Sequence, residues 1–220
     1  MLGHGIDISH HNTKVPYVDI ASERLGRTVC MVRGTYGVKP DSKLCAHFSN
    51  VRLAGFDHVG IYSFFRPSQN TFDQCTSLYS TVKKTTNYGC KSNDVAPALD
   101  IEDDPFGPVE WRTPSPLWVP LIMEVLDGFE RDFSTRPWIY ISERVFEMLG
   151  NPTELLEYPW WLTSIGRPVT NKYKADIRMV QHRVSSWRGL NKQPAFLPKE
   201  KLAIDQNIIV GDLPLINQQA

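Results

Sequence analysis

The sequence has no excess of charge of one sign, because its 220 residues include 24 Lys and Arg and 24 Asp and Glu. A neutral chain lacks the basic field that draws proteins to nucleic acid or to an anionic membrane surface, so neither partner is expected. Long apolar runs are also missing: the run from Val59 to Phe65 ends well before the ~18 residues of a membrane span. Met1 to Gly5 lacks the charged and then apolar pattern of a secretory signal, which leaves the export route open.

Cysteine is scarce, and the four residues present include no Cys-x-x-Cys pair. No glycine-rich phosphate loop is found either, so we expect neither a metal site nor an organic cofactor. Cys30 lies in an apolar segment and is predicted to be a packed thiol. One disulfide among Cys45, Cys75 and Cys90 stays open at this point.

The most informative stretch runs from Val95 to Pro105 and is typical of a buried strand that ends on Asp100 and Glu102. Alternate strand residues face the same way, so these two carboxylates should lie side by side. Burial and mutual repulsion raise the pKa of one of them, which is what cleavage of a glycosidic bond requires. The alternative is a strand that runs into an acidic surface turn. Asp103 and Asp104, which follow, are expected to shape the loop above a cleft.

Short segments rich in Ile, Val, Tyr, Phe and Trp recur along the chain, bounded by Gly, Pro, Asn or Asp, and are predicted to be strands. There are eight of them: Gly5 to Ser9, Thr28 to Tyr36, His58 to Phe65, Ala96 to Glu102, Pro137 to Ser142, Pro159 to Ser164, Asp176 to His182, and Ala203 to Ile209. Helical spacing of apolar residues fills several intervals: Leu44 to Leu53, Thr71 to Val82, Leu117 to Phe129, and Glu143 to Leu149.

The alternation of apolar strands with helices predicts an α/β fold with a parallel sheet. Eight strands suggest closure into an irregular (β/α)-barrel similar to a TIM barrel, and the intervals after Pro159 leave little room for helices. No repeat, low-complexity tract or linker divides the sequence, so we expect one catalytic domain over residues 1–220. In such barrels the chemistry lies at the C-terminal ends of the strands.

Polar residues at the predicted strand ends point to one site. Asp7 lies in the first strand and Asp205 in the last, and these strands become neighbours when a barrel closes. Asp7, Asp100, Glu102 and Asp205 are therefore predicted to converge on an acidic pocket. Aromatic walls would favour a neutral Glu102 and offer flat faces to sugar rings, although core packing is the alternative for each ring. The predicted substrate-binding side chains are Tyr36, Tyr62, Phe64, Tyr140, Trp161, Gln181 and Asn207.

Six motifs carry a resemblance when they are read in order: GIDIS from Gly5, AGF from Ala54, GIYSFFRP from Gly60, LDIE from Leu99, PWIY from Pro137 and IDQNI from Ile204. Together they resemble glycoside hydrolase family 25, the muramidases of the cellosyl and Chalaropsis lysozyme type, over nearly the whole chain. The resemblance implies an irregular barrel with eight strands and about five helices. It also implies hydrolysis of the β-1,4 bond between N-acetylmuramic acid and N-acetylglucosamine in peptidoglycan.

The family's four acidic positions correspond to Asp7, Asp100, Glu102 and Asp205, and Glu102 matches the proton donor. We accordingly expect a monomer that acts on the glycan strands of the cell wall, outside the cytoplasm. Three motifs depart from the family pattern and bear on subsite contacts rather than on the acids. They are Gly34-Thr35-Tyr36-Gly37 in place of Ala-Thr-Glu-Gly, Tyr62-Ser63-Phe64 in place of Tyr-His-Phe, and Val180-Gln181-His182 in place of Trp-Gln-Tyr.

Two other functions would use a similar barrel. A metal-dependent phosphodiesterase or amidohydrolase also needs clustered carboxylates, and His10, His11 and His182 could supply imidazole ligands. A catalytically silent glycan-binding barrel is the second alternative, and the presence of Glu102 argues against it.

Overall fold

Eight strands close into a ring in the computed structural model, which describes residues 3–22, 27–89, 93–165, 168–169, 171–186 and 203–213. Strand β1 pairs with both β2 and β9, which closes the barrel. A two-residue strand, β3 (Lys39–Pro40), extends β2 outside the ring. The strands of the ring are β1 (Gly3–Ile8), β2 (Thr28–Tyr36), β4 (His58–Phe64), β5 (Ala98–Asp100), β6 (Trp138–Ile141), β7 (Pro159–Thr163), β8 (Asp176–Ser186) and β9 (Ala203–Ile209). The predicted eight-stranded barrel is confirmed.

The direction of the last strand differs from the prediction. Neighbouring strands from β1 to β8 run parallel, whereas β9 is antiparallel to both β8 and β1. Antiparallel neighbours need no crossover helix between them, which explains why the chain has so little helical sequence before β9. The start of β9 therefore lies at the end of the barrel where β1 finishes.

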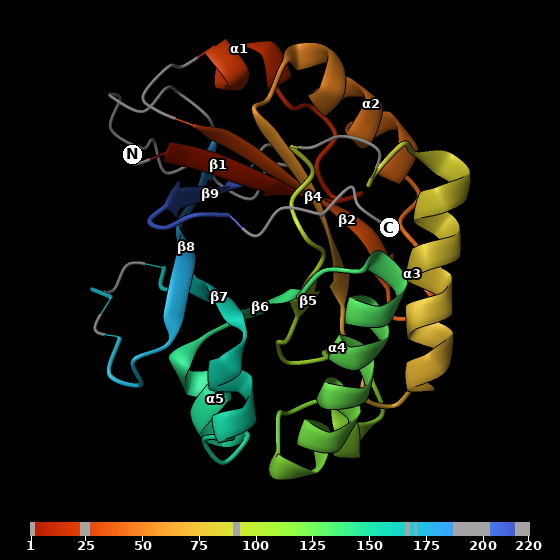
Figure 1. The fold of residues 1–220 in the computed structure, drawn as a ribbon, viewed down its shortest axis with the longest axis vertical. Coiled ribbons are helices and arrows are strands. Elements are labelled where there is room, and N and C mark those ends of the chain that lie inside the picture. The colour runs from red at the N-terminus through yellow and green to blue at the C-terminus, as the bar shows by residue number, and fades with distance from the viewer. Residues whose placement is uncertain are drawn as a thin grey trace.

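Helices cover one side of the ring, as Figure 1 shows from α1 at the top through α3 to α5 at the bottom. In the described part of the chain they are α1 (Tyr17–Ser22), α2 (Leu44–Ala54), α3 (Thr71–Thr85), α4 (Val119–Phe133) and α5 (Glu143–Met148). Short 3-10 turns occur at Val109–Trp111, Pro116–Trp118 and Thr153–Glu157. No α-helix follows β7 in the described residues, as the sequence predicts.

Local signals set the helix boundaries. The side chain of Asn70 accepts a hydrogen bond from the backbone N–H of Asp73 at 3.0 Å and caps α3, and Ser142 caps α5 in the same way. Helix α2 ends at Gly55, whose φ of 83° favours glycine. The predicted apolar stripe from Leu117 was partly wrong, because α4 begins at Val119 and Leu117 is 74% exposed in the preceding turn.

Two apolar cores lie on opposite faces of the sheet. The core between the sheet and the helices includes Ile6, Cys30 and Leu99. The barrel interior is filled by a second cluster: Val29, Met31, Tyr62, Val95, Ala96, Ala98, Trp138, Tyr140, Trp161, Met179, Ile209 and Leu213. A Cβ at Gly5 would lie 2.7 Å from the carbonyl oxygen of Val29, so β1 and β2 can approach this closely only with glycine there.

The remaining predictions on membranes and cysteines can be compared with the described residues. None of the helices among them combines the length and the hydropathy of a membrane span. Cys30 is buried, as predicted, and Cys45 and Cys75 are free thiols. Cys90 and Trp187 lie outside the described residues.

Candidate active site

The four predicted acids meet at one end of the barrel. Asp7 lies near the end of β1, Asp100 ends β5, and Glu102 follows two residues later. Asp205 comes from the start of β9, whose reversed direction brings it opposite Asp7 in the strand register. Asp7 and Asp100 are buried, and Glu102 and Asp205 are partly exposed. Two of these carboxyls therefore form the floor of the site and two can meet solvent.

Asp7 and Asp205 form a carboxyl pair. Burial, the charge of Asp205 and a hydrogen bond with it raise the pKa of Asp7 well above its ordinary value. Burial also raises the pKa of Asp205, to about 6. Two carboxylates that interact in this way cannot both ionise easily, so the pair keeps a proton to higher pH than two separate aspartates.

A network of amides and hydroxyls holds Asp7 in place. Its Oδ2 accepts hydrogen bonds from Asn207 Nδ2 at 2.8 Å and from Gln181 Nε2 at 3.4 Å. The indole of Trp161 donates to Asn207 Oδ1 at 2.7 Å, and Tyr140 donates to Gln181 Oε1 at 2.6 Å. These partners fix which way each amide points, so both present N–H groups to Asp7. Gln181, Asn207, Trp161 and Tyr140 thus form the hydrogen-bond network around Asp7, and their predicted contact with a substrate stays a prediction.

Asp100 and Glu102 lie on the barrel side of the chain, whereas Leu99 and Ile101 are buried in the outer core. Burial and the charges of Glu102 and Asp7 raise the pKa of Asp100 well above its ordinary value. Burial likewise raises the pKa of Glu102, and the negative charges of Asp205 and Asp103 raise it further. Oδ1 of Asp100 is buried without a hydrogen-bond partner. A buried acceptor in this state is available to a donor on a substrate.

A cation missed by the sequence analysis faces these acids. Arg33, on β2, is buried, and its Nε donates to Asp41 Oδ2 at 2.9 Å. Its positive charge lowers the pKa of Asp100 and so opposes the effect of burial there. A charged residue inside an otherwise apolar strand, at an even spacing from Val29 and Met31, is the signal that could have revealed it.

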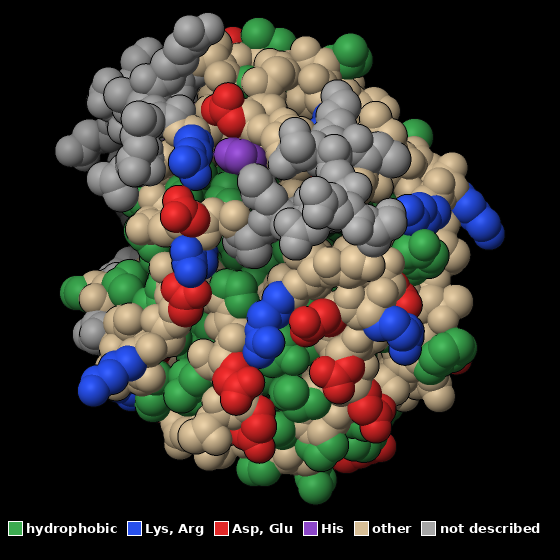
Figure 2. Space-filling model, viewed as in Figure 1, with side chains coloured by type: hydrophobic (Ala, Val, Ile, Leu, Met, Phe, Trp, Pro, Cys, Tyr) green, Lys and Arg blue, Asp and Glu red, His purple; other side chains and the backbone are tan. Residues whose placement is uncertain are grey.

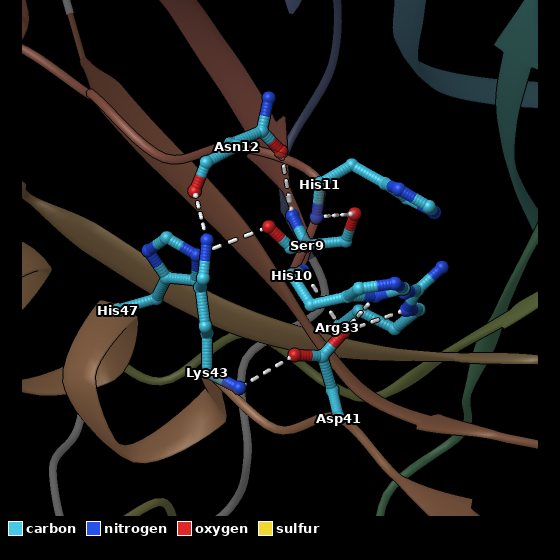
Figure 3. Close-up of polar contacts among 8 residues, drawn as sticks. All are labelled: Ser9, His10, His11, Asn12, Arg33, Asp41, Lys43 and His47. Carbon is cyan, nitrogen blue, oxygen red and sulfur yellow. Dashed lines mark hydrogen bonds and ion pairs between the residues drawn. The ribbon is translucent and has the colours of Figure 1, made fainter. Parts of the chain in front are cut away.

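The loop after β1 is tied to Asp41, as Figure 3 shows. Asp41 accepts the backbone N–H groups of His10 at 3.0 Å and Lys43 at 2.9 Å in addition to Arg33. Burial raises the pKa of Asp41, but these two N–H groups and Arg33 outweigh that effect and hold the pKa below its ordinary value. A charged Asp41 therefore anchors both Arg33 and the loop that follows Asp7.

The predicted aromatic residues divide by depth. Trp161 is 1% exposed and packs edge-to-face against Tyr62 and Tyr140 inside the barrel. It has no free face for a sugar, which favours the core-packing alternative for this ring. Phe64 is buried under Tyr36, with ring centroids 4.5 Å apart. Tyr36, at the end of β2, is partly exposed at the rim. Direct contact of these rings with a substrate stays a prediction.

The metal-dependent alternative relied on His10, His11 and His182 as ligands. His10 and His11 are exposed with ring centroids 3.8 Å apart, and His10 Nδ1 lies 3.3 Å from Asp41 Oδ2. Over the described ranges, no three His, Cys, Asp or Glu side chains gather in an arrangement that could hold a metal ion.

The surface seen in Figure 2 intersperses acidic with basic side chains, as expected for a neutral chain.

The raised carboxyl pKa values predict how stability depends on pH. Asp205 has an ordinary pKa of 3.8 and a pKa of about 6 in the folded protein, so the folded protein binds this proton more tightly than the unfolded chain. The free energy of unfolding is therefore highest, as far as Asp205 is concerned, below pH 3.8 and decreases as the pH rises through 6. Asp205→Asn removes this loss and should raise the free energy of unfolding by about 1 to 3 kcal/mol at pH 7. Urea titrations at pH 7 and pH 4 should show the gain shrinking at the lower pH. Asp127→Asn, an exposed change on α4, serves as the control, and an equal gain at both pH values contradicts the prediction.

Comparisons with solved structures identify the same fold. A muramidase from Acremonium alcalophilum has a TM-score of 0.73 at 18% identity, covering 95% of this chain and 94% of its own. A family 25 lysozyme from Aspergillus fumigatus has a TM-score of 0.73 at 20% identity, covering 96% and 95%. The modular autolysin LytC from Streptococcus pneumoniae, solved with a synthetic peptidoglycan ligand, has a TM-score of 0.69 at 16% identity, covering 94% of this chain and 46% of that one.

No curated protein sequence gives a significant match. The family comparison is decisive by contrast, because the model of glycosyl hydrolases family 25 matches residues 6–188. This range takes in the second half of β1, all of β2 to β8 and three of the four acids. The resemblance seen in the sequence motifs is thereby confirmed, and the chain belongs to glycosyl hydrolase family 25.

Proposed function

We propose that this chain is a muramidase that hydrolyses the β-1,4 bond between N-acetylmuramic acid and N-acetylglucosamine in peptidoglycan. The observation that carries the proposal is the convergence of Asp7, Asp100, Glu102 and Asp205 at one end of the barrel, with the pKa of each raised. Glycosidases need one carboxyl that stays protonated beside another that stabilises positive charge. The peptidoglycan ligand of the similar autolysin LytC supports the choice of glycan.

Glu102 is the general acid in this proposal. It is partly exposed, so it can reach a glycosidic oxygen in the cleft, and its raised pKa keeps it protonated at higher pH than an ordinary glutamate. Its proton goes to the leaving oxygen as the bond from that oxygen to the anomeric carbon breaks. The resulting Glu102 carboxylate then accepts a proton from the water that completes hydrolysis.

Asp100 stabilises the reacting sugar. Its unpartnered Oδ1 can accept the N–H of the substrate's 2-acetamido group. This hydrogen bond orients the acetamido oxygen, which attacks the anomeric carbon as the leaving oxygen departs. Water then attacks the anomeric carbon from the face that the leaving oxygen left and displaces the acetamido oxygen, so the configuration is retained. Direct attack by the Asp100 carboxylate also retains configuration but produces a covalent glycosyl-enzyme, which mass spectrometry of trapped enzyme would reveal.

Asp7 and Asp205 hold charge and water on the other side of the site. Their shared proton allows the pair to carry about one negative charge, which stabilises a developing oxocarbenium ion without a full second charge. Asn207 and Gln181 keep Asp7 fixed while this occurs. The network thereby positions the charge before the reaction begins.

The test is mass spectrometry of the fragments released from purified peptidoglycan. A muramidase leaves N-acetylmuramic acid at the new reducing end, which borohydride reduction marks by a mass increase. Reducing-end N-acetylglucosamine or cleavage of peptide bonds would contradict the proposal. Glycan binding without any release would instead identify the silent barrel.

We also expect the activity to be independent of metal ions. Carboxyls and Arg33 surround the reacting position, and proton transfer by Glu102 requires no Lewis acid. The rate of peptidoglycan solubilisation should stay within about twofold after treatment with EDTA and dialysis. Loss of activity that a divalent cation restores would favour the metal-dependent hydrolase.

A further inference from the structure

The loop that follows Glu102 presents an aromatic ring to solvent. Phe106 is 79% exposed, four residues beyond the proposed acid. Its ring lies edge-on to Tyr36, with centroids 6.5 Å apart, and Tyr36 in turn stacks on Phe64. Phe64 is the strand partner of Asp100. A row of three rings therefore leads from the solvent to the acid cluster.

Buried polar contacts hold this loop in place. Asp104 is fully buried and accepts hydrogen bonds from Tyr36 Oη and from Arg66 Nε, each at 2.9 Å. Its own backbone carbonyl accepts the N–H of Gly107 at 3.0 Å, and its N–H donates to Arg112 at 2.9 Å. Phe106 lies inside this closed turn. Its backbone is fixed before any ligand binds, which reduces the conformational entropy lost on binding.

Tyr36 serves this arrangement as a support. One face of its ring stacks on Phe64, and the guanidinium of Arg66 lies 5.0 Å from its centroid. Its hydroxyl is committed to Asp104. The ring left with an accessible face is that of Phe106. Tyr36 stands where the Ala-Thr-Glu-Gly motif of the family has glutamate. In this chain its phenol ring therefore supports the neighbouring ring of Phe106.

We propose that Phe106 is a sugar-binding residue of the glycan cleft, whose face stacks on a pyranose ring next to the bond that is cleaved. β-Linked pyranoses expose flat C–H faces that pack on aromatic rings, and their hydroxyl groups remain in water. The inference rests on the proposed function and names a contact for the same glycan chain. The Tyr36, Asp104 and Arg66 contacts position the ring before the glycan arrives.

The test compares Phe106→Ala with Phe106→Trp on soluble peptidoglycan glycan chains of defined length. Phe106→Ala should raise KM by about 3- to 10-fold and leave kcat within about twofold, because the contact is made equally in the ground and transition states. Phe106→Trp should keep KM near that of the wild type. Phe72→Ala, a change at a phenylalanine that is 65% exposed on α3, serves as the matched control.

Direct binding separates this inference from the proposed function. The Kd of the same chains is measured with Glu102→Gln as the parent, alone and combined with Phe106→Ala. A weakening of the Kd by about 3- to 10-fold supports the sugar-binding role of Phe106. It does so even if the wild type releases no fragments that end in muramic acid, because that second result contradicts only the proposed function. The sugar-binding role of Phe106 is overturned if Kd and KM are unchanged in the Phe106→Ala variants, or if Phe72→Ala weakens glycan binding equally.

Discussion

Glu102→Gln is expected to lower kcat by about 10²- to 10⁴-fold while the protein stays folded. The amide keeps the size of the side chain but cannot give a proton to the leaving oxygen. Removing a partly buried carboxyl whose pKa is raised also removes a destabilising charge, so the unfolding temperature should stay the same or rise. Initial rates on soluble glycan and thermal unfolding measure the two effects.

The pH profile gives an independent readout of the same residue. Activity of the wild type should fall as the pH rises through the raised pKa of Glu102, because only the protonated form can act as the acid. The residual activity of Glu102→Gln should lack this fall. Glu110→Gln, a change at an exposed glutamate farther along the same connection, should match the wild type. More than about a tenth of wild-type kcat in Glu102→Gln would assign the acid to another residue.

Asp100→Asn is expected to have the second-largest effect, a decrease in kcat of about 10²- to 10³-fold. The amide preserves the shape at this buried position but cannot ionise, whereas Arg33 favours the charged form of Asp100 that stabilises the reacting sugar. It can also turn an N–H toward the substrate at the place where Oδ1 now has no donor. KM should change much less than kcat, because the lost interaction strengthens in the transition state.

The neighbouring Asp103→Asn is the matched control for this variant. Asp103 is exposed and forms an ion pair with Arg144 at the surface, so its loss should change kcat only slightly. NMR of the product formed by the wild type should first show the β-anomer at the new reducing end. An α-anomer, or wild-type kcat in Asp100→Asn, would contradict the assigned role of Asp100.

Local patterns in the sequence were sufficient to locate the strands and most of the helices. Strand segments such as Thr28–Tyr36 concentrate β-branched and aromatic residues between turn residues, and α3 begins at a capping Asn70. Strand alternation also predicted that Asp100 and Glu102 lie side by side, although β5 ends at Asp100 and Glu102 lies beyond the strand. Strand direction was not predictable in this way, since the pattern of β9 reads the same whichever way the strand runs.

Contacts between distant residues decided the remaining features of the site. The sequence by itself determined which carboxyls could take part, and the family motifs indicated their roles. Only closure of the barrel set Asp205 opposite Asp7, and only packing put Trp161 inside the barrel rather than on the cleft. The bonds from Arg33 to Asp41 and from Tyr36 to Asp104 join residues on separate elements. Such pairings depend on the free energy of burying polar and charged groups together, which no local pattern encodes.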